Sequence, residues 1–376
     1  MKADQSAQDV IYLVSCAVRE LVPAASRVAA MDLDAVYAFA ARHMLSAAVA
    51  FALERAGVSD GRSRNAIATA QRRAILFQTA LEQVKLGLEQ AGIWYLPLKG
   101  IVLKDLYPGF GMREFADFDI LFDAERADAV KEIMEGLGFQ VKRYGPGIHD
   151  CYSKPPVLNF EMHRELFGAS RETFRAYYRD VQNRLVGEGL EKRFAPEDLY
   201  LYLLAHMYKH YSVRGTGLRS LLDLYVFLTH ERLDLDYVAA EAEMLGLGEF
   251  EARLRTLALH VFSGDALRDE EREMLGYFVD SGTYGTAVHR LENAMRASRR
   301  GRFGYLLHRF LVPVRKTNGN YAKFAKAYPL FYRHRVLLPF LPCYRCLRAL
   351  RNGKLRTEGK ALWLARVHGG VDTGPF

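Results

Sequence analysis

The period of the hydrophobic pattern changes twice along this chain, and no other feature constrains its fold as strongly. Apolar residues recur at helical spacing up to about residue 90. Between Gly92 and Leu166 the pattern consists of short alternating or aliphatic runs, which predict strands. From about Pro196 onward it is helical again. We therefore expect an α+β fold in which a small mixed sheet is flanked by N-terminal and C-terminal helical domains.

The central stretch divides into closely spaced elements. Its expected strands are residues 93–98, 115–122, 139–144, 149–153 and 157–166, and its expected helices are 101–107 and 124–137. Farther along, helices are expected over 196–211 and 218–228. The domains we expect are an N-terminal helical region (1–90), an α+β core (91–190), a helical domain (191–298) and a basic, aromatic-rich C-terminal segment (299–376).

Composition places the chain among globular proteins of a reducing compartment. Hydrophobic residues make up 50% of it and charged residues 26%, which argues against a disordered chain. Its four cysteines are too few for a disulfide scaffold. No secretory leader is visible, and no apolar run approaches the length of about 18 residues that a spanning helix needs. We therefore expect a cytoplasmic protein.

Positive charge is concentrated toward the C-terminal end. Residues 299–376 contain 17 lysines and arginines against two acidic residues, so this segment carries +15 whereas the whole chain carries +8. Such a segment is expected to meet an anionic partner. An anionic membrane surface, contacted peripherally, is the candidate that we favour over nucleic acid. The alternative is a packed helical segment that its arginines merely solvate.

The most informative motif is Asp117-Phe118-Asp119, in the second expected strand. On a strand, alternate side chains point to opposite faces, so the two aspartates share one face while Phe118 can be buried on the other. Two neighbouring carboxylates repel each other unless a cation lies between them. Their oxygens suit Mg²⁺. The alternative is a pair of solvated acids on an edge strand.

Segments on either side of this motif carry groups that would support phosphate chemistry. Upstream, a hydrophobic strand runs into Lys99-Gly100, where glycine lets backbone N–H groups approach a phosphate and the lysine adds positive charge. Downstream, Glu161 and His163 share one face of an alternating strand, so Glu161 is a candidate third carboxylate. Three carboxylates on adjacent strands suit two-metal phosphoryl transfer.

This ordered set of motifs resembles the nucleotidyltransferases of the DNA polymerase beta superfamily, and more narrowly a bacterial group of uncharacterised nucleotidyltransferases. The similarity extends from about residue 90 to 230. It rests on Leu98-Lys99-Gly100, Leu106-Tyr107-Pro108, Arg113, Asp117-Phe118-Asp119, Glu161-Met162-His163, His206/Lys209/His210 and Gly217/Arg219/Asp223. The chain departs from the superfamily pattern at Lys99, where glycine is commoner, and at Glu161, where aspartate is commoner.

The resemblance implies a polymerase beta-like core and a Mg²⁺-dependent (or Mn²⁺-dependent) reaction. A nucleoside monophosphate would move from a nucleoside triphosphate to an acceptor hydroxyl, with release of pyrophosphate. Asp117, Asp119 and Glu161 would be catalytic and hold the metal, and Glu161 would also accept the acceptor's proton. The residues implied in nucleotide binding are Lys99, Gly100, Arg113, His163, His206, Lys209, Arg219 and Asp223. The acceptor stays open among small molecules, sugars, peptides and protein side chains.

Several of these residues also have a purely structural interpretation. The helix face that bears Lys209 can be an ordinary polar face. Arg219 and Asp223 are spaced four residues apart and can form an intrahelical ion pair. Arg113 can likewise pair with Glu114.

Two other classes of function stay open. The chain can be a nucleic-acid-binding or tRNA-modifying protein that uses its basic C-terminal segment, although no recognition module is visible. It can also be a membrane-associated interaction protein with a degenerate site, against which the presence of all three acids argues. The isolated Cys343-x-x-Cys346 pair is interpreted as structural rather than as zinc-binding or redox-active.

Overall fold

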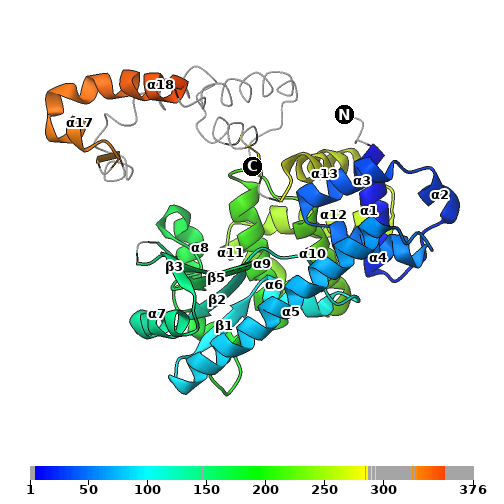
Figure 1. Cartoon of the computed structure of the whole chain (residues 1–376), viewed down its shortest axis with the longest axis horizontal. Coiled ribbons are helices and arrows are strands. Elements are labelled where there is room, and N and C mark those ends of the chain that lie inside the picture. Colours follow the sequence, from blue (N-terminus) through cyan, green and yellow to red (C-terminus); the bar gives the residue numbers. More distant parts are fainter. Residues whose placement is uncertain are drawn as a thin grey trace. The chain divides into compact units, whose positions relative to one another are not determined.

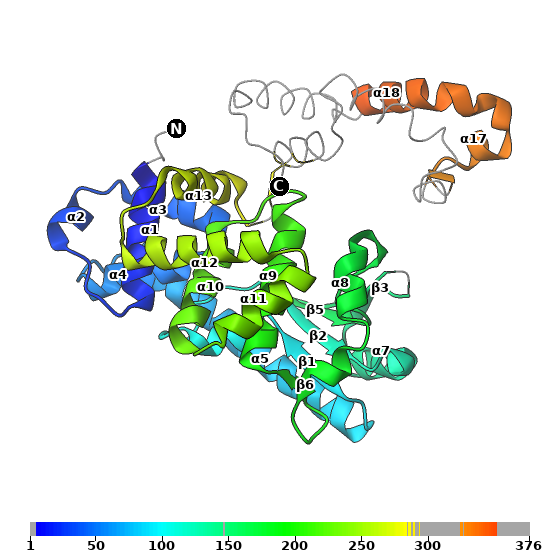
Figure 2. The same cartoon turned by 180° about the vertical axis from the view of Figure 1, so that it is seen from behind.

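The computed structural model of the chain describes residues 5–145, 147–283, 285–286, 289, 293, 324–325 and 327–351. It consists of two units, one formed by Met1–Lys209 with Thr216–Thr283 and the other by His210–Gly215 with Tyr284–Phe376. The first unit contains a five-stranded mixed sheet with helices before and after it (Figure 1, Figure 2). The expected α+β class, with helical flanks around a small mixed sheet, is confirmed.

Within the described residues, the chain before the sheet is helical, as its spacing predicted. The helices are α1 (Gln5–Val18), α2 (Ala25–Ala29), α3 (Leu33–His43), α4 (Ser46–Arg55) and α5 (Gly61–Gln90). Asp32 begins α3 because its side chain accepts a hydrogen bond of 3.1 Å from the amide of Ala35. Asp60 begins α5 in the same way, through a 2.7 Å bond from the amide of Ser63. α1 packs against α3, α4 and α12, so helices from both ends of this unit share a core.

The sheet has the strand order β1-β2-β5-β4-β3. Its strands are β1 (Tyr95–Leu98), β2 (Phe118–Phe122), β3 (Gln140–Arg143), β4 (His149–Lys154) and β5 (Leu158–His163). β2 and β5 are parallel, whereas β1–β2, β3–β4 and β4–β5 are antiparallel. Each strand overlaps one of the strands that alternation predicted.

Strand β2 begins at Phe118 and not at Phe115, close to the point where its antiparallel neighbour β1 ends. Leu98, the last residue of β1, pairs with Asp119, and Phe118 pairs with Phe160 of β5. The residues before Phe118 therefore have no partner on the β1 side, although β5 on the other side begins two residues earlier, at Leu158. Asp117 consequently lies in the loop that enters β2, and only Asp119 is on the strand itself.

The helix expected over 101–107 is shorter than predicted. It consists of α6 (Gly100–Leu103) followed by the 3₁₀ turn η1 (Lys104–Leu106). Tyr107 is extended, with φ −86° and ψ 138°, because a residue that precedes proline is disfavoured in the helical region. The chain then runs without regular structure to β2.

One face of the sheet is apolar and is covered by helices α5 and α7 (Ala127–Gly136). Phe118 and Ile120 of β2 pack there with Phe160 of β5. Phe77 of α5 is fully buried, and its ring centroid lies 4.8 Å from that of Phe118 and 6.2 Å from that of Phe160. Because side chains alternate along a strand, the residues between these apolar ones face the opposite side.

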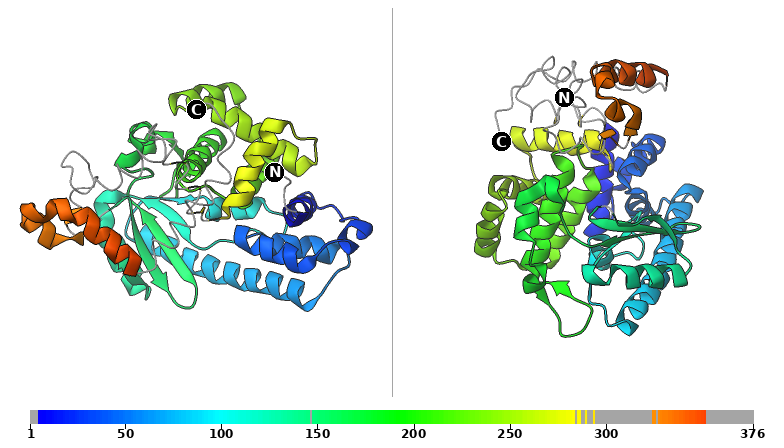
Figure 3. Two further views of the ribbon diagram at one scale, coloured as in Figure 1. Left: turned by 90° about the horizontal axis from the view of Figure 1, so that it is seen from above. Right: turned by 90° about the vertical axis from the view of Figure 1, so that its left-hand side faces the viewer.

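The first unit is mainly helical after the sheet. Its remaining elements are η2 (Ala124–Arg126), η3 (Ala169–Arg171), α8 (Glu172–Tyr177), η4 (Val181–Arg184), β6 (Leu185–Val186), β7 (Arg193–Phe194), α9 (Pro196–Tyr211), α10 (Leu218–His230), α11 (Leu235–Met244), α12 (Gly248–Ser263) and α13 (Asp269–Ser281). The helices expected over 196–211 and 218–228 are thus confirmed. The β6–β7 ribbon was not expected, because strands of two residues leave no alternation to detect. The left view of Figure 3 shows the sheet between α5 on one side and the green helices on the other.

In the second unit the structure describes α17 (Pro329–Arg333), η6 (Arg335–Phe340) and α18 (Leu341–Arg351). The guanidinium of Arg345 lies over the ring of Phe324, 4.9 Å from its centroid. Much of the basic segment 299–376 lies outside the described residues, and so does the side chain of Cys346. Among the helices that the structure describes, none is both long enough and apolar enough to cross a bilayer.

Candidate active site

The polar face of the sheet gathers carboxylates and histidines on two parallel strands. Asp119 of β2 is level with Glu161 of β5, and Leu121 is level with His163. Ligand atoms of Asp119, Glu161 and His163 all lie within 4.8 Å of one another. The sequence places these three side chains on the face opposite the apolar core by alternation, and the parallel register brings them together.

Asp119 is the most constrained acid of this group. Its side chain is 6% exposed, and its Oδ1 accepts hydrogen bonds from Lys99 Nζ at 2.7 Å and from His163 Nε2 at 2.8 Å. Burial alone would raise the pKa of Asp119, but the Lys99 ammonium and the His163 hydrogen bond outweigh burial and hold this pKa below its ordinary value. Asp119 is therefore a carboxylate at neutral pH.

Lys99 reaches Asp119 because of an unusual backbone turn. It has φ +48° and ψ −114° between β1 and α6, a conformation that costs a residue other than glycine about 1–3 kcal/mol. The sequence placed Lys99 at this turn, but it did not reveal the ion pair with Asp119. Backbone strain of this kind is characteristic of functional sites.

The other two carboxylates differ in their surroundings. Burial and the neighbouring charge of Asp119 raise the pKa of Glu161 to about 7. Asp117 is exposed on average, but partial desolvation of its carboxyl group and the charge of Asp119 raise its pKa. Asp117 is not part of the group whose ligand atoms lie within 4.8 Å. The structure thus brings Asp119 and Glu161 together and leaves Asp117 outside this group.

Helix α9 contributes a second lysine to this region. Lys209 is half-buried, and burial together with the charge of Lys99 lowers its pKa to about 8. The carboxylates of Asp119 and Glu161 act in the opposite direction, which places Lys209 within their electrostatic reach. His206 lies one turn earlier on α9 and is also half-buried.

Arg113 and Asp223 form a buried ion pair that holds the loop before β2. Arg113 Nε and Nη2 each donate to one oxygen of Asp223 at 2.7 Å, and Tyr107 Oη donates to Oδ1, also at 2.7 Å. A Cβ added to Gly100 would lie 2.5 Å from Arg113 Nη1, so the glycine makes room for this guanidinium. The alternative pairing of Arg113 with Glu114 is therefore wrong.

Arg219 does not form the alternative intrahelical ion pair with Asp223 either. It is half-buried, and its Nη1 donates to the carbonyl oxygen of Glu114 at 2.9 Å. Its Nε finds no hydrogen-bond partner among the described residues. Burial and the charge of Arg113 lower the pKa of Arg219. Arg219 and Asp223 thus both hold the loop that leads to Asp117, from the same helix α10.

Two residues beside the carboxylates were missed by sequence reasoning. His149 and Cys151 of β4 lie on the polar face, where Cys151 is paired with Glu161 and His149 with His163. Ligand atoms of His149, Cys151 and Glu161 also lie within 4.8 Å of one another. The strand expected over 149–153 could have indicated them, because residues two apart on a strand share a face and His149 and Cys151 are two apart.

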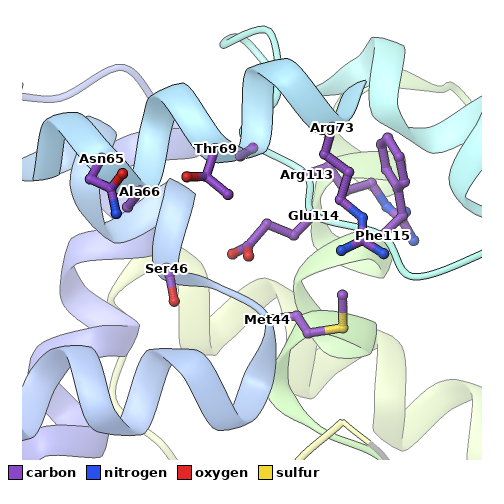
Figure 4. Close-up of a pocket in the computed structure, with 10 residues that line it drawn as sticks. Met44, Ser46, Asn65, Ala66, Thr69, Arg73, Arg113, Glu114 and Phe115 are labelled. Atoms are coloured by element: carbon purple, nitrogen blue, oxygen red, sulfur yellow. The ribbon is translucent and has the colours of Figure 1, made fainter. Parts of the chain in front are cut away.

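A cavity of about 230 Å³ lies apart from the three carboxylates. Figure 4 shows it between α4 and α5, with the side chain of Glu114 extending between Ser46 and Thr69. Glu114 Oε2 accepts a hydrogen bond from the amide of Ala47 at 3.1 Å, and burial raises its pKa. This carboxylate serves the first turn of α4, so we do not assign the cavity to the reaction.

A family model described as "Uncharacterised nucleotidyltransferase" matches residues 29–263, more than half of the chain. Every residue of the site described above lies inside the match. The comparisons with curated proteins and with solved structures find no match.

Proposed function

The chain belongs to the uncharacterised nucleotidyltransferase family, and from this premise we propose that it transfers a nucleoside monophosphate from a nucleoside triphosphate to an acceptor hydroxyl. The observation that carries the proposal is the convergence of Asp119 and Glu161 on parallel strands with Lys99 and Lys209 beside them. Paired carboxylates with nearby cations are the groups that phosphoryl transfer requires.

The donor set fits a divalent metal. Asp119 and Glu161 offer carboxylate oxygens within 4.8 Å of each other, and Asp117 adds a third carboxylate at the rim. Oxygen-rich sets of this kind suit Mg²⁺ or Mn²⁺. We assign Asp117, Asp119 and Glu161 as the residues that would hold it. When bound, such an ion neutralises phosphate charge and favours attack at the α-phosphorus.

The lysines and the remaining residues act on the nucleotide and on the carboxylates. Lys99 and Lys209 provide positive charge for the β- and γ-phosphates, and His163 fixes the orientation of Asp119 through its 2.8 Å hydrogen bond. The buried Arg113–Asp223 pair, with Gly100 beneath it, positions the loop that carries Asp117. His206 and Arg219 remain candidate contacts to the nucleotide.

In the proposed reaction, each bond that forms is matched by one that breaks, and a residue of the chain takes up the released proton. The acceptor oxygen forms a bond to the α-phosphorus while the bond from the α-phosphorus to the bridging oxygen breaks, and pyrophosphate leaves with that electron pair. The proton of the acceptor hydroxyl goes to Glu161. A pKa of about 7 suits Glu161 to this task, because a general base works best when its pKa lies near the working pH.

Label transfer tests the proposal. The full chain is incubated with Mg²⁺, a cell extract and each nucleoside triphosphate, labelled either at the α- or at the γ-phosphate. We expect α-label in a new product and γ-label only in pyrophosphate. Asp117→Ala should abolish the transfer without unfolding the chain, because Asp117 is exposed. Asp105→Asn, whose side chain is 72% exposed, is the matched control.

Three outcomes would count against the proposal or one of its parts. γ-Label in the product would mean phosphate transfer rather than nucleotide transfer. Equal Mg²⁺-dependent nucleotide binding by the wild type and Asp117→Ala in calorimetry would remove this carboxylate from the site. Salt-sensitive RNA binding without label transfer would favour the nucleic-acid alternative.

The basic segment 299–376 is proposed to contact an anionic membrane surface peripherally. Its charge of +15 and its aromatic residues support this proposal, because mixed basic and aromatic pieces are typical of segments that lie at a lipid interface.

A further inference from the structure

Strand β4 and strand β5 together present a second, chemically different set of metal ligands. His149 and Cys151 are two residues apart on β4, and Glu161 is level with Cys151 on β5. One ligand atom from each lies within 4.8 Å of the others. The set therefore combines one imidazole, one thiol and one carboxylate on a single face of two hydrogen-bonded strands.

This donor set does not suit Mg²⁺, which prefers oxygen ligands. Thiolate and imidazole are the ligands of zinc and related transition metals, and three protein ligands with one open position are a common zinc arrangement. We propose that His149, Cys151 and Glu161 form a binding site for a thiophilic divalent ion, Zn²⁺ in particular, beside the site that serves the reaction.

The backbone already fixes the approach of the three side chains. Directly opposite residues of an antiparallel pair have Cβ atoms about 4.5–5.5 Å apart. His149 Nε2 lies 3.4 Å from Glu161 Oε2. Zinc ligands bind at about 2.0–2.3 Å from the metal, so neighbouring ligand atoms around zinc are also separated by roughly 3.4 Å. The three ligand atoms are therefore already close to the spacing that a zinc ion requires.

A positively charged side chain, that of Arg143, already contacts two of these ligands. Its guanidinium hydrogen-bonds His149 Nε2 and also the thiol of Cys151. Arg143 is exposed on the edge strand β3, so its side chain can leave without disturbing the core. His149 Nδ1 is buried and finds no hydrogen-bond partner among the described residues, and the Arg143 contact is made by Nε2.

Glu161 belongs to both ligand sets. An ion held by His149 and Cys151 would draw this carboxylate away from the acceptor. Zinc should therefore inhibit nucleotide transfer. This consequence rests on the proposed function, whereas the metal site itself does not.

Cobalt spectroscopy tests the site without any enzymatic activity. Co²⁺ replaces zinc and gives a thiolate-to-cobalt charge-transfer band in the near ultraviolet. The background is full-length chain carrying Cys343→Ser and Cys346→Ser, which removes the only Cys-x-x-Cys pair of the sequence. We expect a band that saturates at one ion per chain, that excess Zn²⁺ abolishes, and that is lost when Cys151→Ser is added.

Arg143→Ala in the same Cys343→Ser/Cys346→Ser protein serves as the control in which the opposite effect is expected. It should tighten Zn²⁺ binding, whereas His149→Ala should weaken it by more than about tenfold, since even outer-shell changes at metal sites cost about 10–100-fold. A cobalt band that persists with Cys151→Ser, or no band in the folded background protein, would overturn the proposal.

The inhibitory consequence is measured separately, as the ratio of transfer rates with and without Zn²⁺ in each variant. Cys151→Ser should raise that ratio toward one. An equal ratio in the wild type and Cys151→Ser overturns the inhibitory link. If no transfer activity is found at all, the proposed function fails while the cobalt result still decides the site.

Discussion

At the scale of single residues, the environments of Asp119 and Glu161 divide their tasks. Asp119 is kept ionised by Lys99 and His163. Glu161 has only a 3.4 Å and a 3.7 Å contact with histidine nitrogens and a pKa raised to about 7. Two carboxylates whose surroundings move their pKa values apart are suited to different roles in one reaction.

Glu161→Gln should therefore keep nucleotide binding and lose turnover. The amide preserves shape and removes the proton acceptor, and general bases typically contribute about 10²–10⁴-fold to a rate. Calorimetry with nucleotide and label transfer with the same preparation separate the two effects. Transfer at the wild-type rate would show that Glu161 accepts no proton.

Lys209 gives the nucleotide affinity a predicted pH dependence. A lysine is charged below its pKa, so with a pKa of about 8 Lys209 is a cation at neutral pH and loses its charge as the pH rises through 8. Triphosphate affinity should fall over the same range. Lys209→Arg should keep its affinity above pH 8, because arginine stays charged. Parallel pH profiles of the wild type and Lys209→Arg would contradict the contact.

At the scale of elements, the loop between α6 and β2 is held by α10. Asp223 of α10 binds both Arg113 and Tyr107 of that connection, and Arg219 of the same helix binds the carbonyl of Glu114. This explains how an exposed Asp117 can be positioned although it lies outside β2.

Asp223→Asn should destabilise the protein by about 3–5 kcal/mol, because it leaves the buried guanidinium of Arg113 without a countercharge. The measurement is chemical unfolding, with Asp105→Asn as the exposed control, for which a change below about 0.5 kcal/mol is expected. Nucleotide affinity of the folded variant reports separately whether Asp223 contacts the ligand. An unchanged free energy of unfolding would mean that the pair does not stabilise the loop.

Helix α10 is also tied to the N-terminal helices through His43 of α3. The amide of Leu218 donates to His43 Nδ1 at 3.2 Å, and burial together with the charge of Arg42 lowers the pKa of His43 to about 4. A neutral histidine is thus required in the fold. The stability that neutral His43 contributes to the folded state is fully present above the unfolded pKa of about 6.5. It is lost as the pH falls toward 4, because the buried side chain must then take up a proton.

At the scale of the whole molecule, charge separates the two ends of the chain. Residues 299–376 carry +15, whereas the preceding residues are acidic in sum. Such a charge distribution favours binding of an anionic surface by the C-terminal segment and not by the rest of the chain.

Vesicle flotation measures this contact. The full chain should float with vesicles that contain anionic lipid, should stay behind with neutral vesicles, and should be released by high salt, which screens exposed charges. A variant carrying Lys354→Glu, Arg356→Glu and Lys360→Glu should float less. If the intact protein ignores anionic vesicles at low salt, the segment has no membrane role.

Local patterns along the chain were enough to predict the strands of the sheet and the direction of its polar side chains. Alternation along the strands settled that Asp119, Glu161 and His163 would face away from the apolar core, because that pattern depends only on neighbouring residues. The same reasoning found the five strands of the described sheet and the helices on both sides.

Only the tertiary structure decided which distant groups meet. Arg113 and Asp223 are 110 residues apart, and their pairing depends on how α10 packs against the loop before β2. The pairing of β4 with β5 sets His149 and Cys151 beside Glu161. The left-handed turn at Lys99 aims its ammonium at Asp119. Strand register, helix packing and a strained turn are properties of the assembled chain, so no local pattern could specify these contacts.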